Sequence, residues 1–204
     1  MSGKGPIRLG ILVSGGGRTA LNLHETIAAG KLDASIAIVI SSRSDAAAVE
    51  RCVTAGLPVE VVDRQSTPDK SFHERIAQLL RDAEVDLVCM GGFLSLWRIP
   101  PDFAGRVINI HPALLPEFGG KGYFGDRVHR AVLESGATET GCTVHYADDL
   151  YDHGPIILQR RVPVLAGDTV EELAARVFAE EMIAYPQAIQ TFIDRFGTSP
   201  SESD

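Results

Sequence analysis

The chain has 204 residues, of which 45% are hydrophobic and 23% are charged. That length supports one sizeable hydrophobic core and does not require two. Its formal charge of -8 argues against general nucleic-acid binding, which needs a basic face. No apolar stretch approaches the roughly 20 residues that cross a bilayer, and the sequence opens without a signal-peptide pattern, so we expect a cytoplasmic protein. Cys52, Cys89 and Cys142 lie far apart, which predicts reduced, buried thiols rather than disulfides or a zinc site.

Strand-like and helix-like patterns alternate along the chain. Strands are expected at 7–13, 34–40, 58–62, 85–90, 106–110, 142–146 and 156–164, and helices at 19–29, between Ser44-Asp45 and Gly56, at 68–83, 126–135 and from Asp168-Thr169 to Ala184. Ser44-Asp45 resembles a helix cap. The alternation predicts an α/β fold, specifically a single-domain three-layer sandwich with a mostly parallel central sheet. We expect this domain to span 1–197 and a disordered polar tail to follow at 198–204.

A glycine turn separates the first expected strand from the first helix. Gly15, Gly16 and Gly17 allow the backbone to turn sharply, and the start of the helix at Arg18 and Thr19 adds a partial positive charge. Such a turn can bind a phosphate, although it can also be a plain tight connection. The pattern is neither a Walker loop nor a dinucleotide fingerprint.

A second group of polar residues follows the strand at 106–110. Asn109 and His111 are two residues apart, so their side chains point to the same side of a strand that Pro112 ends. Asp152, in a polar turn between two later strands, is the carboxylate most suited to join them. The amide could stabilise an oxyanion and the imidazole could supply positive charge or a proton. The alternative is that these are ordinary structural and turn residues.

The remaining histidines carry less weight. His145 alternates along a strand and is expected to line the site from below, whereas His129, His73 and His24 are expected at helix surfaces or in packing. The sequence contains no HExxH, CxxC or GxSxG pattern, so we predict no metal site and no serine hydrolase.

Taken together, these motifs resemble those of the folate-dependent formyltransferases, from about residue 7 to residue 190. The segments that carry the resemblance are Ser14-Gly15-Gly16-Gly17, Gly91-Gly92-Phe93-Leu94, Asn109-Ile110-His111-Pro112-Ala113-Leu114-Leu115-Pro116, Gly141-Cys142-Thr143-Val144-His145, Asp152-His153-Gly154-Pro155-Ile156-Ile157 and Val162-Pro163-Val164-Leu165-Ala166-Gly167-Asp168. The resemblance implies a Rossmann-like formyltransferase fold and transfer of a formyl group from 10-formyltetrahydrofolate, used as a co-substrate without a metal. The pattern is closest to the purine-pathway branch of the family, whose acceptor is phosphoribosylglycinamide. Its partners would be these small molecules, with no nucleic acid or membrane, in a monomer or homodimer.

The same resemblance implies roles for individual residues. Asn109 and a protonated His111 would stabilise the oxyanion formed when the amine attacks the formyl carbon, and Asp152 would orient His111 and help to relay a proton. Gly15, Gly16, Gly17, Arg18 and Thr19 match the phosphate-binding turn, and Glu181 matches an acidic residue that contacts the sugar or glycinamide part. The folate-binding residues would be Leu94, Ser95, Leu96 and Trp97, together with Asn109, Asp148 and Asp152.

The sequence also departs from the family pattern. Arg18-Thr19-Ala20 replaces the usual small and amide residues, which adds a guanidinium near the phosphate turn. Lys70 is only a weak substitute for a family arginine near the third helix, and the glycine-rich segment 118–125 could act as a mobile lid. A formyltransferase acting on tRNA would have a further domain and a basic surface, and a formyltetrahydrofolate hydrolase would have a regulatory domain. A sugar-amine formyltransferase, a 10-formyltetrahydrofolate hydrolase and a non-catalytic folate- or nucleotide-binding module stay open as alternatives.

Overall fold

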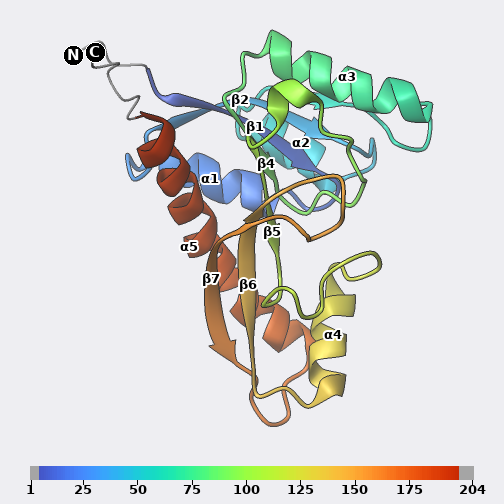
Figure 1. Cartoon of the computed structure of the whole chain (residues 1–204), viewed down its shortest axis with the longest axis vertical. Coiled ribbons are helices and arrows are strands. Elements are labelled where there is room, and N and C mark those ends of the chain that lie inside the picture. Colours follow the sequence, from blue (N-terminus) through green and yellow to red (C-terminus); the bar gives the residue numbers. More distant parts are fainter. Residues whose placement is uncertain (1–4, 198–204) are drawn as a thin grey trace, which may run out of the picture.

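Seven strands form one sheet in the computed structural model, which describes residues 5–197 (Figure 1). The strands are β1 (Ile7–Val13), β2 (Ala34–Ser41), β3 (Val59–Val61), β4 (Leu87–Met90), β5 (Val107–His111), β6 (Glu139–Tyr146) and β7 (Ile156–Pro163). Their order is β3-β2-β1-β4-β5-β6-β7. The neighbours from β3 to β5 pair in parallel, whereas β6 and β7 are added antiparallel. The expected mostly parallel sheet is confirmed.

Helices cover both faces of this sheet. They are α1 (Arg18–Ala28), α2 (Ala47–Thr54), α3 (Asp69–Asp82), α4 (Asp126–Ser135) and α5 (Val170–Gly197), with a short 3-10 helix at Pro101–Phe103. One buried cluster joins the sheet to α1, α2, α4 and α5, and a second joins its other face to α3 and the 3-10 helix. The predicted three-layer α/β sandwich is therefore confirmed, with a helical layer on each side of the sheet.

The alternation of side chains along β1 explains this layering. Leu9, Ile11 and Val13 belong to the cluster under α1 and α5, whereas Leu12 belongs to the cluster under α3. Gly10 faces α3 at close range, since a Cβ atom there would lie 2.5 Å from Leu80 Cδ2. Helices bury both faces of β1, which explains why its sequence is largely apolar instead of alternating between apolar and polar residues.

The longest helix runs further than its sequence pattern predicted. Helix α5 starts where expected. Its first turn forms a capping box, in which the Thr169 hydroxyl accepts from the Glu172 amide and the Glu172 carboxylate accepts from the Thr169 amide. The expected end at Ala184 is wrong, because the helix continues through Pro186 to Gly197. Proline removes the amide that would bond to the Met182 carbonyl. That carbonyl instead accepts a hydrogen bond of 3.0 Å from Asn22 Nδ2 on α1.

The predicted cap of α2 is also wrong. The hydroxyl of Ser44 donates to Asp63, and the carboxylate of Asp45 pairs with Arg43, so neither side chain caps the helix. The Ala48 amide in the first turn of α2 donates instead to the Gly15 carbonyl at 3.0 Å. Helix α2 is therefore tied directly to the glycine turn after β1.

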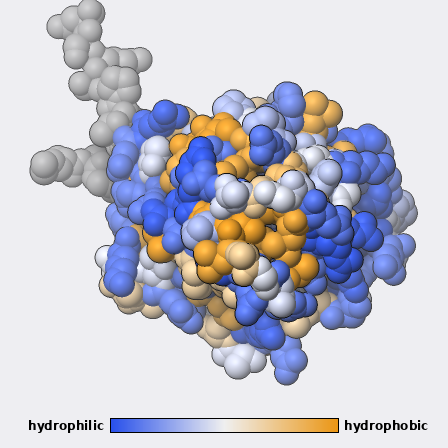
Figure 2. Space-filling view, turned by 90° about the horizontal axis from the view of Figure 1, so that it is seen from below, coloured by the Kyte–Doolittle hydropathy of each residue, from blue (hydrophilic) through white to orange (hydrophobic). Residues whose placement is uncertain are grey.

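Other sequence expectations concern the rest of the chain. All three cysteines are free and buried, as expected. Between residues 5 and 197, no helix is both long and apolar enough to cross a membrane. In the view from below, hydrophobic residues gather near the middle of the face, and hydrophilic residues surround them (Figure 2). The polar tail predicted at 198–204 lies outside the described residues.

The sheet order creates a natural position for a ligand. Strand β1 is followed by β2 on one side, and the chain crosses back to place β4 on the other side. In open α/β sheets, ligands bind beyond the carboxyl ends of the strands at such a switch point. The glycine turn after β1, the Gly91-Gly92 turn after β4 and the end of β5 at His111 all meet there.

Candidate active site

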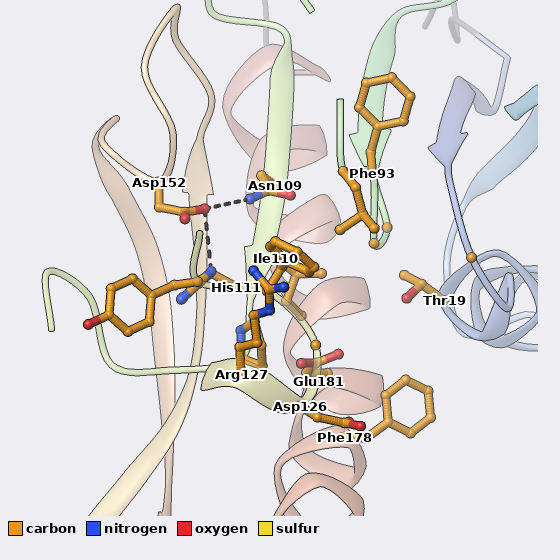
Figure 3. Close-up of a pocket in the computed structure, with 18 of the residues that line it drawn as sticks. Thr19, Phe93, Asn109, Ile110, His111, Asp126, Arg127, Asp152, Phe178 and Glu181 are labelled. Carbon is orange, nitrogen blue, oxygen red and sulfur yellow. Dashed lines mark hydrogen bonds and ion pairs between the residues drawn. The ribbon is translucent and has the colours of Figure 1, made fainter. Parts of the chain in front are cut away.

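A cavity of about 580 Å³ opens at this edge of the sheet. Segments far apart in the sequence form its wall: the turn and first residues of α1, the Gly91-Gly92 turn, the end of β5, the glycine-rich loop and one face of α5 (Figure 3). The cavity brings together most of the residues singled out in the sequence, namely Gly15, Gly16, Gly17, Arg18, Thr19, Leu94, Asn109, His111, Asp152 and Glu181.

Asn109 and His111 both contact Asp152 at the end of β5. His111 Nδ1 lies 3.4 Å from Asp152 Oδ1, and Asn109 Nδ2 donates to the same oxygen at 3.3 Å (Figure 3). The side chains of His111 and Asp152 are only 4% and 9% exposed. An amide, an imidazole and a carboxylate therefore share one sheltered position.

The glycine-rich loop fixes the orientation of His111. The Nε2 atom of His111 lies 2.8 Å from the Phe118 carbonyl oxygen, which can only accept a hydrogen bond. Nε2 therefore carries a hydrogen, and Nδ1 faces Asp152. A hydrogen on Nδ1 as well makes the ring cationic and pairs it directly with the carboxylate.

Asp152 is held in its ionised form by this environment. Burial opposes ionisation, but the hydrogen bond and charge of His111, together with the Gly120 amide 3.0 Å from Oδ2, keep the pKa of Asp152 below its ordinary value. The residue has a positive φ of 52°, which is uncommon for a residue other than glycine. The loop at 118–125 thus contacts both His111 and Asp152, and its predicted mobility stays a prediction.

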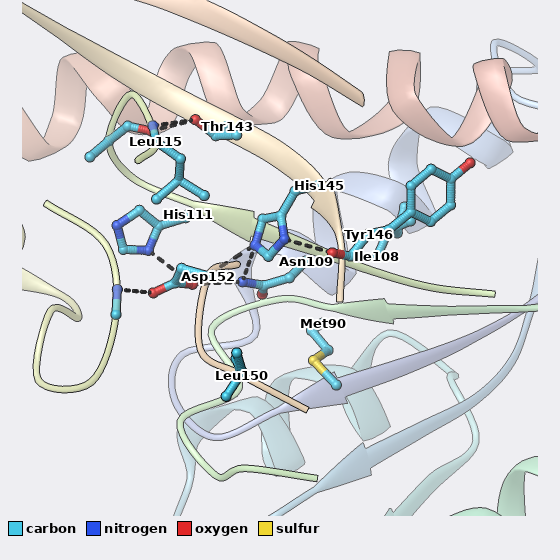
Figure 4. Close-up of polar contacts among 12 residues, drawn as sticks. Met90, Ile108, Asn109, His111, Leu115, Thr143, His145, Tyr146, Leu150 and Asp152 are labelled. Atoms are coloured by element: carbon cyan, nitrogen blue, oxygen red, sulfur yellow. Dashed lines mark hydrogen bonds and ion pairs between the residues drawn. The ribbon is translucent and has the colours of Figure 1, made fainter. Parts of the chain in front are cut away.

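His145 is closer to the centre of the site than its weight in the sequence suggested. It lies opposite Asn109 in the antiparallel register of β5 and β6, and its Nε2 is 3.1 Å from Asn109 Nδ2 (Figure 4). Its Nδ1 is 2.8 Å from the Tyr146 carbonyl and must carry the hydrogen, so Nε2 accepts from Asn109. Burial lowers the pKa of His145 and favours this neutral form. His145 therefore orients the Asn109 amide.

The glycine turn leaves its backbone amides available. Gly17 has a φ of 72°, and α1 begins after it without a side-chain cap. In the stretch from 5 to 197, the amides of Gly17, Arg18 and Thr19 donate to no acceptor. Arg51 donates to the Gly16 carbonyl at 3.0 Å, so that oxygen has a donor within the protein. The arrangement is that of an anion site at a helix N-terminus.

Helix α5 presents three residues to the same cavity. Ala174, Phe178 and Glu181 are separated by four and three positions, so they share one helix face. Burial raises the pKa of Glu181 to about 7, although the charges of Arg18 and His111 oppose this shift. Phe178 was not singled out in the sequence, yet it lies one turn before Glu181 with the Arg18 guanidinium over its ring. Its spacing from Glu181 is the signal that would have found it.

The segment predicted to hold a folate lies between this cavity and two neighbouring ones. Leu94 lines the main cavity, whereas Ser95, Leu96 and Trp97 line a second cavity of about 60 Å³ that Asn109 and Asp152 also border. Trp97 is 1% exposed, so most of its ring packs in the core under α3. Asp148 borders the second cavity, but its oxygens bind the Leu150 amide and His153.

Lys70 does not reach any of these cavities. It pairs with Glu74 on the exposed side of α3 at 3.7 Å. A third cavity of about 360 Å³, beside Leu94, Ser95 and Leu96, is instead lined by Arg64 and Arg98, both of which pair with Asp69. The structure thus offers two arginines next to the segment, in place of the lysine suggested by the sequence.

Comparisons with known proteins point to one family. Residues 7–189 match the family model described as "Formyl transferase". The chain is 39% identical over 192 residues to a chloroplastic phosphoribosylglycinamide formyltransferase of Vigna unguiculata, covering 92% of this chain and 61% of that protein. It is 37% identical over 187 residues to a trifunctional purine biosynthetic protein of Drosophila pseudoobscura pseudoobscura, covering 89% of this chain and 13% of that one. The chain therefore spans less than two thirds of either relative's length.

A solved structure agrees with these sequence matches. The structure of glycinamide ribonucleotide transformylase 1 from Symbiobacterium toebii superimposes with a TM-score of 0.85 and 39% sequence identity. The superposition covers 95% of this chain and 93% of that one. The similarity therefore extends over the whole sheet and the helices that flank it.

Proposed function

This chain belongs to the formyl transferase family, and we propose that it transfers the formyl group of 10-formyltetrahydrofolate to the amine of 5'-phosphoribosylglycinamide. This reaction would place it in purine biosynthesis, in line with the names of its relatives. The observation that carries the proposal is the contact of Asn109, His111 and Asp152 in one cavity with an unpaired amide turn. A cytoplasmic location and a monomer or homodimer stay predictions from the sequence.

The chemistry of the site fits formyl transfer. An amine that attacks a formyl carbon drives negative charge onto the formyl oxygen, and donors already in place stabilise that charge. His145 aligns the Asn109 amide group. Of the two hydrogen bonds that Asn109 Nδ2 makes, the one to Asp152 is longer, at 3.3 Å, and a developing oxyanion would replace it. His111 supplies a cationic donor while Asp152 holds its ring. Asp152 then accepts, through an intervening water, the proton that the amine loses. The same route returns a proton to the folate nitrogen as its bond to the formyl carbon breaks and the oxyanion collapses to the new formamide.

The walls beside the reacting groups suit a reduced folate. Leu94 and Leu96 are 47% and 36% exposed, although both border cavities, and exposed apolar side chains of this kind commonly mark ligand surfaces. One face of the pterin ring system would cover them. Asn109 and Asp152 border both the main cavity and the second cavity, and so face the point where two substrates would meet.

The tail of the folate would extend toward the third cavity. A folate ends in a glutamate with two carboxylates, and this cavity presents Arg64 and Arg98 next to Leu94 and Leu96. Both arginines pair with Asp69, at 2.6 and 3.5 Å, so they stay in place near the cavity without a ligand. We expect them to attract the carboxylates of the tail.

The acceptor would bind at the other end of the main cavity. The free amides of the glycine turn and the Arg18 guanidinium provide a neutral and a charged set of donors for a phosphate. Glu181, on the facing helix, lines the same cavity and would contact the sugar or glycinamide part of such a substrate. A phosphorylated amine would then span from the glycine turn to Asn109 and His111.

A formyl-transfer assay with a panel of acceptors tests the proposal. We expect the full chain with 10-formyltetrahydrofolate to turn over phosphoribosylglycinamide, with little activity toward sugar amines, tRNA or water. Turnover of another acceptor without phosphoribosylglycinamide activity would overturn the acceptor and leave the family reaction. Binding of both ligands without any turnover would favour a non-catalytic module instead.

A further inference from the structure

The Arg18 side chain is held by an aromatic ring instead of a carboxylate. Its guanidinium carbon lies 3.9 Å from the centroid of the Phe178 ring, where α1 and α5 meet at the main cavity. In the part of the chain from 5 to 197, this guanidinium makes no hydrogen bond or ion pair. The positive charge at the mouth of the cavity is therefore uncompensated by any direct partner.

The kind of contact determines what Arg18 can still bind. A carboxylate partner would occupy the edge of the guanidinium, where all five N–H groups lie. An aromatic ring attracts the cation through its face and leaves that edge free. The guanidinium is planar, so fixing its face also fixes the direction of its edge, and a phosphate can then bind two N–H groups at once.

The surroundings of the stack suit an anion. Arg18 is the first residue of α1, and the amides of Gly17, Arg18 and Thr19 have no acceptor in the described chain. Figure 3 shows Phe178 and Glu181 projecting from α5 into the cavity that Thr19 faces from α1. Phe178 is partly buried, whereas Arg18 is exposed. The exposed guanidinium can therefore meet an anion that enters the cavity while its face stays on the ring.

We propose that Phe178 is a positioning residue that turns the edge of the Arg18 guanidinium toward the phosphate of the acceptor substrate. The inference rests on the proposed function and deepens it, because it assigns the choice of phosphorylated over unphosphorylated acceptors to one contact between α1 and α5. Backbone amides bind any small anion, whereas a fixed planar cation favours a doubly charged phosphate.

Substitution of Phe178 separates this role from general packing. Phe178→Leu keeps an apolar side chain but removes the aromatic face, and Phe178→Tyr keeps the face. We expect Phe178→Leu to raise the KM for the phosphorylated acceptor by about threefold to tenfold, with kcat and the KM for the folate unchanged. The KM for the acceptor without its phosphate should not change. Phe178→Tyr should restore the KM to within about twofold of the wild type.

A double-mutant cycle tests whether Phe178 acts through Arg18. The variant with both Arg18→Ala and Phe178→Leu should resemble Arg18→Ala alone, since the ring has no role once the guanidinium is gone. Additive effects of the two substitutions would overturn the inference. An equal rise in KM for both forms of the acceptor in Phe178→Leu would also overturn it, because that pattern indicates a general packing defect.

Binding of ribose 5-phosphate, measured by calorimetry, distinguishes this inference from the proposed function. Weaker binding to Phe178→Leu than to the wild type supports the positioning role even if no formyl transfer occurs. Normal formyl transfer with identical binding by the wild type and Phe178→Leu would overturn the positioning role and leave the proposed function standing.

Discussion

At the scale of single residues, the polar contacts of the site converge on Asp152. Asn109, His111 and His145 lie within 3.8 Å of its Oδ1 atom, and the Gly120 amide binds Oδ2. One carboxylate thus orients the amide, the imidazole and the glycine-rich loop. The negative charge of Asp152 is therefore more important for the arrangement of the site than the volume of its side chain.

Replacement of Asp152 by asparagine tests the need for that charge. Asp152→Asn keeps the volume but removes the partner of a cationic His111, so we expect kcat to fall by at least about 100-fold, a typical effect for a lost acid–base group. Folate binding should change little. Steady-state kinetics and a folate binding titration would measure both. Asp149→Asn, at an exposed position three residues earlier, should retain wild-type turnover, and wild-type turnover by Asp152→Asn would contradict the proposed chemistry.

Glu181 gives a prediction about pH and stability. Burial raises its pKa from 4.5 to about 7 in the folded chain, so the unfolded chain releases this proton first as the pH rises. The carboxyl therefore stabilises the fold below about pH 4.5, and this contribution is lost as the pH rises through about 7. From pH 5 to pH 8, the free energy of unfolding of the wild type should fall by about 2 to 3 kcal/mol more than that of Glu181→Gln.

Urea unfolding at the two pH values measures this difference. Glu180→Gln is a useful comparison, because the Glu180 carboxylate pairs with Arg160. Among residues 5–197, no cation forms an ion pair with Glu181. A pH dependence that is the same in wild type and Glu181→Gln would show that Glu181 ionises in both states at the same pH.

The sequence predicted part of the site from local spacing. Asn109 and His111 share a side because they are two residues apart on a strand, and that prediction needed no tertiary information. His145 and Phe178 were undervalued because their roles depend on partners distant in sequence, Asn109 across a strand pair and Arg18 on another helix. Spacing within an element could indicate their side but not their partner.

At the scale of elements, the start of α1 depends on a single glycine. Gly17 has a φ of 72°, and a Cβ atom there would lie 2.8 Å from Ala48 Cβ and 2.9 Å from Ala48 Cα. Any side chain would strain the backbone and push α1 from α2. The turn of 15–17 therefore cannot tolerate a larger residue at its last position.

Gly17→Ala should destabilise the fold and the anion site together. We expect a loss of about 2 to 4 kcal/mol in the free energy of unfolding, from the left-handed backbone and the contact with Ala48. The KM for the phosphorylated acceptor should rise while the KM for the folate stays close to normal. Gly15→Ala is the matched control for stability, since a Cβ atom there meets nothing within 4 Å. Equal stability of the two variants would contradict this account.

The predicted element types were correct, but tertiary contacts decided two of their ends. Helix α5 passes Pro186 because Asn22 of α1 satisfies the carbonyl that the proline leaves free. The Ser44-Asp45 cap failed because Asp63 and Arg43 bind those side chains, and the Gly15 carbonyl takes their place at α2. Local pattern predicts where a helix can start or end, and neighbouring elements decide whether it does.

At the scale of the whole molecule, one hydroxyl ties the longest helix to the centre of the sheet. Tyr185 on α5 is fully buried, and its hydroxyl lies 2.8 Å from the Met90 carbonyl and 3.1 Å from the Ile108 carbonyl. Burial raises the pKa of Tyr185 well above its ordinary value, so the hydroxyl keeps its proton as a donor. It thereby sets the position of α5 against β4 and β5, the strands that lead to Gly91 and His111.

This contact predicts that stability and acceptor binding are coupled. Glu181 and Phe178 lie one and two turns before Tyr185 on the same helix, so a shift of α5 against the sheet would move both. Tyr185→Phe removes one buried hydroxyl and should lower the free energy of unfolding by about 1 to 2 kcal/mol. The KM for the acceptor should rise by a few-fold, whereas the folate, held mainly by other segments, should bind normally.

Urea unfolding and steady-state kinetics on the same preparation would test that coupling. Tyr146→Phe is the matched control, because the Tyr146 hydroxyl makes no hydrogen bond in the stretch from 5 to 197 and should contribute less than about 0.5 kcal/mol. If Tyr185→Phe lowers stability but leaves the acceptor KM unchanged, α5 is positioned by its apolar packing alone. If both values change, the hydroxyl links the sheet centre to the face of α5 that carries Glu181 and Phe178.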